Sequence, residues 1–291
     1  MKQQNIFVIG GSGLVGSQAS HILEKTYKIT SLSTSTGVDI TNPQSLRVIV
    51  DASDSNILIH FAAKTDVDSC EEDRLLGENG DAWKINVQGV KNIVDVCRKA
   101  KMKLIYISTD FVFDGMKSVD DAYQEDDVAH PINWYGETKY QGEQLVLRSN
   151  IPFIIARIAY PYGGSHSKKL DFATVVKTRL GNGQNVSAVT DHIFTPTYID
   201  DVAYALDLLI KKQADGIFHV VGSELLTPYH AAIQIADMFG YDRTLVTPVA
   251  RADYFSGRAA RPFNLSLKND KIQLLGIQMR SFTSGLNELK E

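Results

Sequence analysis

The run Ile6-Phe7-Val8-Ile9 leads directly into Gly10-Gly11-Ser12-Gly13-Leu14-Val15-Gly16, and a helix-forming pattern follows over residues 14–24. A short apolar strand, a glycine-rich turn and a helix are the context of a dinucleotide site. The first glycines let backbone N–H groups approach a pyrophosphate at the helix N-terminus, and the last lets helix and strand pack closely. No Gly-Lys-Ser/Thr follows, which excludes a Walker-type phosphate loop. We therefore predict that a cofactor contacts this turn through Gly10, Gly11, Ser12, Gly13, Leu14, Val15 and Gly16.

Strand-like and helix-like segments alternate through the first two thirds of the chain. The strands are apolar throughout, as expected when helices cover both faces of a parallel sheet. This predicts an α/β fold, a Rossmann doubly wound sheet. Further strands are expected at 28–32, 38–40, 56–61, 104–107 and 153–156, and further helices at 41–50, 83–99 and 135–148.

The alternation breaks after Arg157, where a helix over 172–180 and a strand over 185–189 are expected. We predict a dinucleotide-binding Rossmann domain over residues 1–157. Residues 158–291 would form mainly a smaller, partly discontinuous substrate-binding lobe, with some segments returning to the Rossmann core.

Composition limits the classes of function. The 291 residues are 44% hydrophobic and carry a formal net charge of −4, which provides no positive field for nucleic acid or an anionic membrane. No apolar run approaches the ~18 residues of a membrane span, and the amino terminus leaves no room for a signal peptide. Two cysteines suit a reducing compartment, and the histidines lack metal-ligand spacing. We expect a cytoplasmic protein that acts on a small molecule and binds no metal.

The end of the second strand bears on the choice of cofactor. An NAD site usually has an acidic residue there, but this chain has Ser33-Thr34-Ser35-Thr36. Hydroxyls without a carboxylate leave room for the 2′-phosphate of NADP, although no lysine or arginine accompanies them. We expect NADP, with NAD as the alternative, and contacts from Ser33. Asp39 and Ile40 follow on the next expected strand, where Asp39 is better placed for the adenine amine.

Tyr135 and Lys139 indicate the chemistry. They lie four residues apart in a predicted helix and so share one face. An ammonium group beside a phenol stabilises the phenolate, and a pKa lowered by ~2–3 units would make Tyr135 a usable general acid for carbonyl reduction. Thr109 ends the strand before this helix, at the carboxyl edge where open α/β folds bind ligands.

Together the glycine turn, Ser108-Thr109-Asp110 and the Tyr135/Lys139 pair resemble the extended short-chain dehydrogenase/reductase family. Within it the chain is most similar to the dTDP-4-dehydrorhamnose reductases, on segments that include 108–115 and 131–143. The resemblance implies an NAD(P)-dependent oxidoreductase that reduces a 4-keto sugar nucleotide, and it allows a homodimer. By the family pattern the catalytic residues are Thr109, Tyr135 and Lys139, and Lys139 also holds the nicotinamide ribose. Further contacts implied are Ala62, Ala63 and Asn86 for the cofactor, and Thr65, Asp110, Phe111, Tyr160 and Arg261 for the substrate.

Three positions depart from that family pattern. Phe111 stands where tyrosine is usual, Tyr160 where tryptophan is common, and Asp171 where asparagine is common. A carboxylate at Asp171 would repel a substrate diphosphate. Arg251, Arg258 and Arg261 could clamp that diphosphate or could form a solvated basic stretch.

Two other functions remain open. The first is a nucleotide-sugar epimerase or dehydratase on the same fold, although a dehydratase usually has a glutamate where Phe111 stands. The second is a non-catalytic NADP-binding regulatory subunit, because a methionine adenosyltransferase partner resembles the same family.

Overall fold

The computed structural model describes residues 3–52 and 55–290, so Met1 and Lys2, on which part of the amino-terminal expectation falls, lie outside the described residues. Its centre is a six-stranded sheet in which all neighbouring strands are parallel. This confirms the predicted Rossmann-like α/β class. The strand order is β2 (Lys28–Leu32), β1 (Asn5–Ile9), β3 (Ser55–His60), β4 (Lys103–Thr109), β5 (Phe153–Ile158) and β9 (Gly216–His219).

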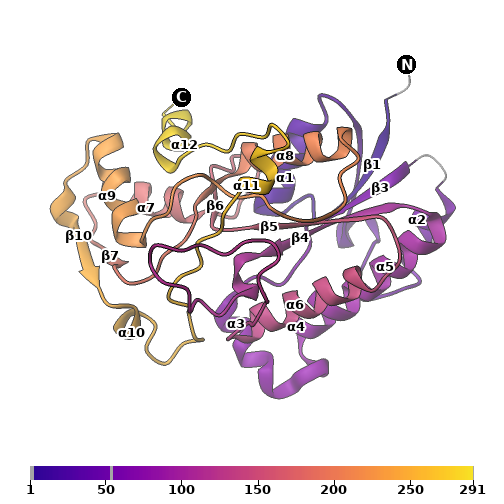
Figure 1. Ribbon diagram of the computed structural model, residues 1–291, viewed down its shortest axis with the longest axis horizontal. Helices are drawn as coiled ribbons and strands as arrows, with labels where there is room; N and C mark the ends of the chain where they lie inside the picture. The colour runs from indigo at the N-terminus through magenta and orange to yellow at the C-terminus, as the bar shows by residue number, and fades with distance from the viewer. Residues whose placement is uncertain (1–2, 53–54, 291) are drawn as a thin grey trace.

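Helices cover both faces of this sheet (Figure 1). One face carries α1 (Leu14–Leu23) and α8 (Ile199–Lys211), and the other carries α2 (Arg47–Asp51), α5 (Gly89–Ala100) and α6 (Trp134–Leu147). Strand β1 shows why its sequence is apolar at every position. Ile6 and Val8 belong to the core under α1 and α8, whereas Phe7 and Ile9 belong to the core on the opposite face.

The predicted strand over residues 38–40 is wrong, because this segment has no ladder partner. The Ser45 hydroxyl binds the Asp39 backbone instead, accepting from its N–H at 2.9 Å and donating to its carbonyl at 2.7 Å. The same turn delays the next helix, which begins at Arg47 rather than at residue 41.

The helix predicted over 83–99 is also subdivided. It comprises α4 (Asp81–Trp83), a π-helical turn over Lys84–Gln88, and α5. Before it lies α3 (Val67–Glu72), followed by a 3-10 segment (Asp73–Asn79). Shorter 3-10 turns are Thr34–Thr36, Asp110–Val112 and Arg243–Leu245.

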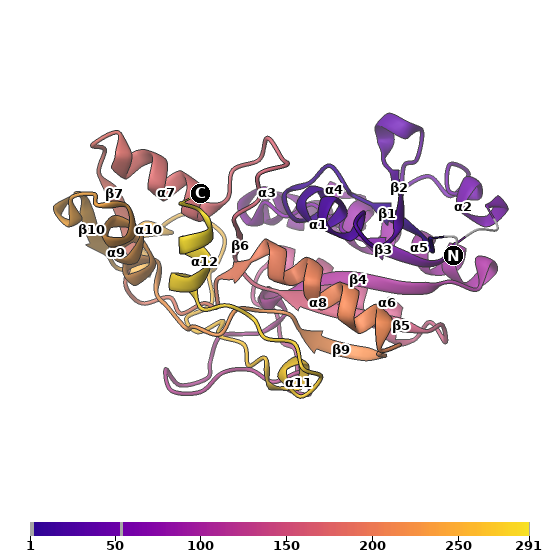
Figure 2. The same cartoon turned by 90° about the horizontal axis from the view of Figure 1, so that it is seen from above.

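A second lobe lies at the carboxyl edge of the sheet, as Figures 1 and 2 show. Two small parallel sheets pair β7 with β10 and β6 with β8. The predicted helix 172–180 and strand 185–189 correspond to α7 and β7. The remaining elements are β6 (Pro161–Tyr162), α7 (Phe172–Gly181), β7 (Val186–Val189), β8 (Thr197–Tyr198), α9 (Pro228–Phe239), β10 (Val246–Val249), α10 (Arg251–Tyr254), α11 (Asp270–Gln273) and α12 (Phe282–Glu288).

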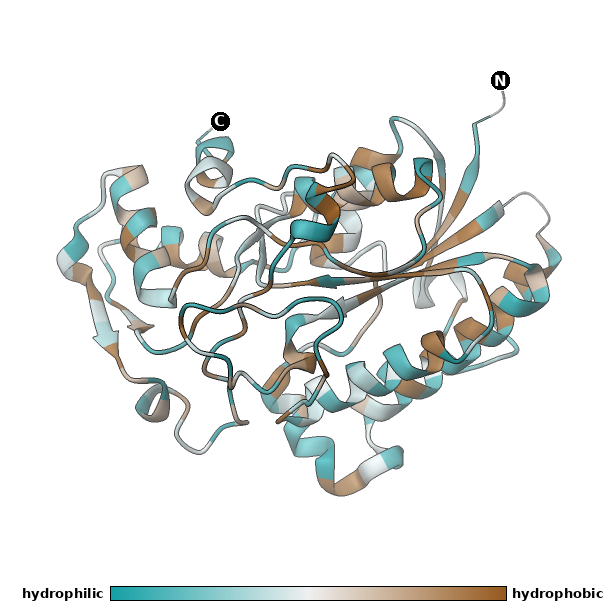
Figure 3. Cartoon of the chain, viewed as in Figure 1, coloured by the Kyte–Doolittle hydropathy of each residue, from teal (hydrophilic) through white to brown (hydrophobic). Residues whose placement is uncertain are grey.

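Two segments beyond residue 157, α8 and β9, belong to the main sheet and its cover rather than to the second lobe. The division of the chain at residue 157 stays a prediction. Figure 3 shows the amphipathic colouring of α5 and α6, whose hydrophobic residues alternate with hydrophilic ones along each helix. Across the described ranges, no helix is both long and apolar enough to cross a bilayer.

Candidate active site

A cavity of about 960 Å³ lies between the carboxyl edge of the sheet and the second lobe. The residues that line it come from segments that are far apart in the sequence. Of the residues predicted for the site, nearly all line it, namely Gly10, Ser12, Gly13, Leu14, Val15, Gly16, Ser33, Asp39, Ile40, Ala62, Ala63, Thr65, Thr109, Asp110, Phe111, Tyr135, Lys139, Tyr160 and Arg261.

Two predicted cofactor contacts, Gly11 and Asn86, are not part of this lining. A Cβ at Gly11 would lie 2.7 Å from the Ser31 hydroxyl oxygen, so this glycine serves packing within the fold. The buried Asn86 amide donates to the Lys64 carbonyl at 2.9 Å and to the Thr138 hydroxyl at 3.0 Å, and its oxygen accepts from the Lys64 N–H. Asn86 therefore fixes the loop after β3 through the Lys64 backbone and does not line the cavity itself.

The glycine turn fits a dinucleotide. Gly10 has φ +82°, and a Cβ there would collide with the backbone of Ala62; a Cβ at Gly16 would collide with the Gly10 carbonyl. Gly13 is different, because its Cβ would meet only the Gly10 carbonyl oxygen at 3.4 Å, an ordinary contact. The chain's own packing therefore does not require glycine at 13. Gly13 is also the N-cap of α1 and supplies no side-chain cap, which suits the close approach of an anionic group to the helix N-terminus.

The hydroxyl-rich segment after β2 closes one end of the cavity. Ser33 and Thr36 form a capping box, and the Ser33 and Ser35 hydroxyls are 2.7 Å apart. The Asp39 carboxylate accepts from the N–H and hydroxyl of Thr41, both at 2.8 Å. Asp39 thus lines the cavity while its charge is directed to its own loop.

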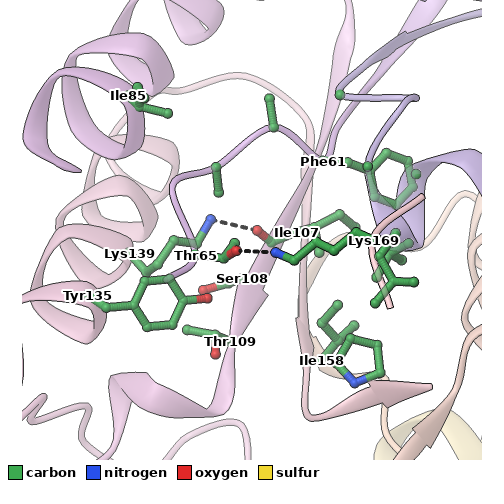
Figure 4. A pocket seen from close by; sticks show the side chains of 18 of the residues that line it. Phe61, Thr65, Ile85, Ile107, Ser108, Thr109, Tyr135, Lys139, Ile158 and Lys169 are labelled. Carbon is green, nitrogen blue, oxygen red and sulfur yellow. Dashed lines mark hydrogen bonds between the residues drawn. The ribbon is translucent and has the colours of Figure 1, made fainter. Parts of the chain in front are cut away.

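Tyr135 and Lys139 project from α6 toward the end of β4, where Ser108 and Thr109 lie (Figure 4). The Lys139 ammonium donates to the Ile107 carbonyl at 2.8 Å and lies 4.1 Å from the centre of the Tyr106 ring. Burial lowers the pKa of Lys139 to about 7, and the nearby Glu143 carboxylate opposes that shift.

The pKa of the Tyr135 phenol differs from expectation. Burial raises the pKa of its phenol, and the hydrogen bond that opposes this comes from Thr109 rather than from Lys139. The predicted lowering of the phenol pKa by Lys139 is therefore absent here. The physical reason is that both groups are desolvated in one wall and the ammonium is directed at Ile107.

The start of α6 is held tightly against the end of β4. The Asn133 side chain caps the helix by accepting from the Gly136 N–H at 2.8 Å. A Cβ at Gly136 would collide with the Phe111 carbonyl, so glycine permits the close approach. The Phe111 ring packs edge-on against Tyr135 with centroids 5.6 Å apart. These contacts fix the Tyr135 ring relative to Thr109.

Asp110 is a buried carboxyl in the cavity wall. One oxygen accepts from the Thr109 hydroxyl at 2.9 Å, and the other has no hydrogen-bond partner. Burial raises the pKa of Asp110 to about 7, although the Thr109 bond acts in the opposite direction. Asp110 can therefore carry a proton near neutral pH.

Tyr160 presents its ring to the cavity while its hydroxyl is already bonded. His192 Nδ1 lies 2.7 Å from the Pro262 carbonyl, which can only accept, so Nδ1 carries the proton. His192 Nε2 then accepts from the Tyr160 hydroxyl, also at 2.7 Å. Tyr160 has φ +40°, a strained value for a side-chain-bearing residue.

The charged residues near which we expected a substrate are paired in an arrangement that the sequence did not reveal. Asp171 caps α7 and accepts from the Thr174 N–H and hydroxyl and the Gly163 N–H, so its charge is offset by three donors. Asp68 accepts from Arg258 at 2.8 Å and from Arg261 at 2.9 Å. Burial would raise the pKa of Asp68, but the two guanidinium groups outweigh it and hold that pKa below its usual value.

Of the three candidate arginines, Arg258 and Arg261 line the cavity and Arg251 does not. Arg251 instead donates to the Arg261 backbone carbonyl. The sequence left two interpretations of these arginines, a clamp for a diphosphate or a solvated basic stretch, and neither interpretation fits all three. Arg261 is nearly buried, whereas Arg258 retains 44% of its side-chain surface.

Lys169 also lines the cavity, although nothing in the sequence of its loop indicated a functional residue. Its ammonium donates to the Thr65 hydroxyl at 3.1 Å and so bridges the loop before α7 and the loop after β3 (Figure 4). Tyr254 and Phe255 also line this side, in the segment without periodicity. Within residues 3–52 and 55–290, no three histidine, cysteine or acidic side chains are grouped to hold a metal ion.

This chain is similar to known proteins over nearly its whole length. A family model described as RmlD substrate binding domain matches residues 4–291. The dTDP-4-dehydrorhamnose reductase of Aggregatibacter actinomycetemcomitans is 31% identical over 98% of this chain and 98% of its own. The crystal structure of dTDP-4-dehydrorhamnose reductase from Bacillus anthracis in complex with NADP is 30% identical, with a TM-score of 0.89 over 99% of this chain and 98% of that one. Methionine adenosyltransferase 2 subunit beta of Xenopus laevis is 30% identical over 86% of this chain and 74% of its own.

Proposed function

The chain belongs to the RmlD substrate binding domain family, and on that premise we propose that it reduces the ketone of a 4-keto sugar nucleotide with NADPH. The observation that carries the proposal is the single cavity wall in which Thr109, Tyr135 and Lys139 meet, beside the glycine turn. Tyr135 donates the proton to the ketone oxygen. The Thr109 hydroxyl hydrogen-bonds that oxygen and keeps it in reach of the phenol.

The residues of the glycine turn would hold the dinucleotide, with its pyrophosphate at the N-terminus of α1 and its adenosine end near Ser33 and Asp39. A bound NADPH supplies the hydride for the ketone carbon. Lys139 holds the nicotinamide ribose through its ammonium and, as a cation, stabilises the phenolate that Tyr135 becomes. Support for NADP over NAD comes from the hydroxyls after β2 and from the NADP complex of the Bacillus anthracis relative.

The second lobe would hold the sugar nucleotide. Thr65, Asp110, Phe111 and Tyr160 line the cavity and would contact the keto sugar. Arg261, Arg258 and Lys169 bring positive charge to the same cavity and are suited to the diphosphate. The Asp171 carboxylate accepts hydrogen bonds from the Thr174 N–H and hydroxyl at the start of α7, so its oxygens are directed at its own helix and it does not oppose this assignment.

The test is turnover by the purified protein on nucleotide-linked 4-keto sugars, followed by NADPH or NADH absorbance. We expect oxidation of NADPH, with slower oxidation of NADH, and formation of the corresponding hydroxyl sugar. Redox-neutral conversion of a sugar nucleotide without net consumption of NADPH would instead favour the epimerase or dehydratase alternative. The absence of a glutamate after Asp110, where Phe111 stands, disfavours a dehydratase.

A second candidate is a role as a subunit of a methionine adenosyltransferase, favoured by the 30% identity to the Xenopus laevis subunit beta. The discriminating measurement is co-purification with a catalytic subunit, combined with no turnover of any keto sugar. The predicted homodimer would be detected by light scattering of the purified chain.

A further inference from the structure

A carboxylate lies one further turn along the face of α6 that bears Tyr135 and Lys139. Glu143 follows Lys139 by four residues, as Lys139 follows Tyr135, so the three side chains share one helix face. Glu143 is 0% exposed, and Lys139 is 2% exposed. An unpaired carboxylate would be costly at such a position, and its presence requires a partner.

Arg157, on the neighbouring strand β5, is that partner. Its Nε donates to one Glu143 oxygen at 3.0 Å and its Nη2 to the other at 2.8 Å, a two-pronged pair in which neither side chain is more than 3% exposed. The guanidinium also lies 5.0 Å from the Phe113 ring centre and 3.4 Å from His219 Nε2. Arg157 is thereby held from several sides, and it fixes the orientation of the Glu143 carboxylate.

Lys139 has few other groups that would favour its charged form. Its ammonium donates a hydrogen bond to the Ile107 carbonyl and lies over the face of the Tyr106 ring. His60 is fully buried with both ring nitrogens unpartnered, and burial lowers its pKa to about 3, so it is neutral. Burial raises the pKa of the Tyr106 phenol, whose hydroxyl is also unpartnered, so this group is neutral too.

Tyr135 and Asp110 both line the cavity, and burial raises the pKa of both. Of the ionisable groups around Lys139, Glu143 is the one whose charge raises the pKa of Lys139. Burial lowers the pKa of Lys139 to about 7 even with Glu143 opposing the shift.

We propose that Glu143, oriented by Arg157, is a positioning residue that keeps Lys139 an ammonium ion behind Tyr135. The consequence for turnover rests on the proposed function, because only a charged Lys139 stabilises a tyrosinate and attracts the anionic cofactor. The effect on Lys139 itself does not depend on which substrate the protein uses.

The direct test is a titration of the Lys139 side chain by NMR in protein labelled with ¹³C-lysine, without cofactor. The Lys139 signal is the one that disappears in Lys139→Met. In Glu143→Gln we expect its midpoint to move to lower pH by about one unit, since a close opposite charge raises a lysine pKa by about this much or more. Glu143→Asp keeps the charge and should restore most of the shift.

Glu137→Gln is the matched control, because Glu137 lies on the same helix and its carboxylate accepts a hydrogen bond from the Gln141 side chain. It should leave the Lys139 midpoint unchanged. Glu143→Gln leaves the buried Arg157 unpaired and could unfold the chain. The double variant Glu143→Gln/Arg157→Gln removes that unpaired charge and should still titrate at lower pH than wild type.

An unchanged Lys139 midpoint in either variant, with the fold intact by circular dichroism, overturns the proposal. If the protein reduces keto sugars, the basic limb of the kcat profile of Glu143→Gln should move to lower pH by the same amount, with KM for the sugar nucleotide unchanged. If it turns over no keto sugar, the proposed function fails while the NMR titration still decides the role of Glu143.

Discussion

Arg261 donates to the Asp68 carboxylate at 2.9 Å across 193 residues of sequence, and it lines the cavity with only 8% of its side chain exposed. The guanidinium is therefore held in place before any substrate arrives. A pre-positioned arginine loses little conformational entropy when it binds a diphosphate. The segment before Arg261 is further tied to α6, because the Asn133 amide, at the start of that helix, donates to the Ala260 carbonyl at 2.9 Å.

Arg261→Ala should raise KM for the sugar nucleotide about tenfold to a hundredfold, the worth of a charge-assisted pair of ~1.5–3 kcal/mol. Its NADPH affinity should not change, because Arg261 belongs to the part of the cavity that we propose for the sugar nucleotide. Arg243→Ala is the control, since Arg243 is exposed and pairs with Asp237 outside the cavity lining. Steady-state kinetics of both variants check this, and an unaltered KM in Arg261→Ala removes the diphosphate assignment.

Lys169→Met should raise the same KM by no more than about fivefold, because an exposed ionic contact is worth ~1 kcal/mol or less. Lys168→Met provides a matched comparison, as Lys168 adjoins it but does not line the cavity. Equal effects of the two substitutions would mean that only the net charge of the loop matters.

Tyr135→Phe should lower kcat by ~10²–10⁴, the usual contribution of a general acid, and leave folding and NADPH binding intact. The Phe111 ring would still pack edge-on against the substituted ring. Tyr140→Phe, on the same helix, should retain wild-type rates. A Tyr135→Phe enzyme with near wild-type turnover on the true substrate would falsify the proton-transfer assignment.

Lys139→Met should make the cofactor-free protein more stable at neutral pH while weakening NADPH binding. Burial lowers the pKa of Lys139 from its ordinary 10.5 to about 7, so between these values the unfolded chain binds more protons than the folded one. The free energy of unfolding of the wild type therefore rises with pH across this window. Below pH 7 the buried ammonium of Lys139 lowers that free energy by its full amount. Urea unfolding at pH 7 and pH 9.5 should show a larger rise for wild type than for Lys139→Met, with Lys91→Met behaving as wild type.

Gly13→Ala and Gly16→Ala separate ligand contact from packing. Alanine at 13 meets only an ordinary contact, so the free energy of unfolding should change by less than about 1 kcal/mol, whereas NADPH should bind at least ~10-fold more weakly. Alanine at 16 collides with the Gly10 carbonyl and should destabilise the fold by ~1–3 kcal/mol or more. Calorimetric titration and thermal unfolding measure the two effects. Unchanged NADPH affinity in Gly13→Ala would contradict the fit of the dinucleotide to this turn.

Sequence reasoning succeeded where the determinant is local. The strand–glycine–helix order of residues 6–16 predicts the first Rossmann unit, since each step depends on near neighbours. It failed over residues 38–40, where an apolar appearance suggested a strand and the Ser45 hydroxyl took the backbone groups instead. A side chain that competes for backbone hydrogen bonds leaves no periodic signal.

Local spacing also specifies that Tyr135 and Lys139 share a helix face, because four residues make about one helical turn. Whether a charge at that face is stabilised or suppressed depends on solvent exclusion and on partners from other strands, such as Arg157 beside Glu143. The pairing of Asp68 with Arg258 and Arg261 likewise joins segments about 190 residues apart. Coulombic and desolvation energies depend on distance and burial in space, and only the tertiary structure sets these, so it alone decided the electrostatics of the cavity.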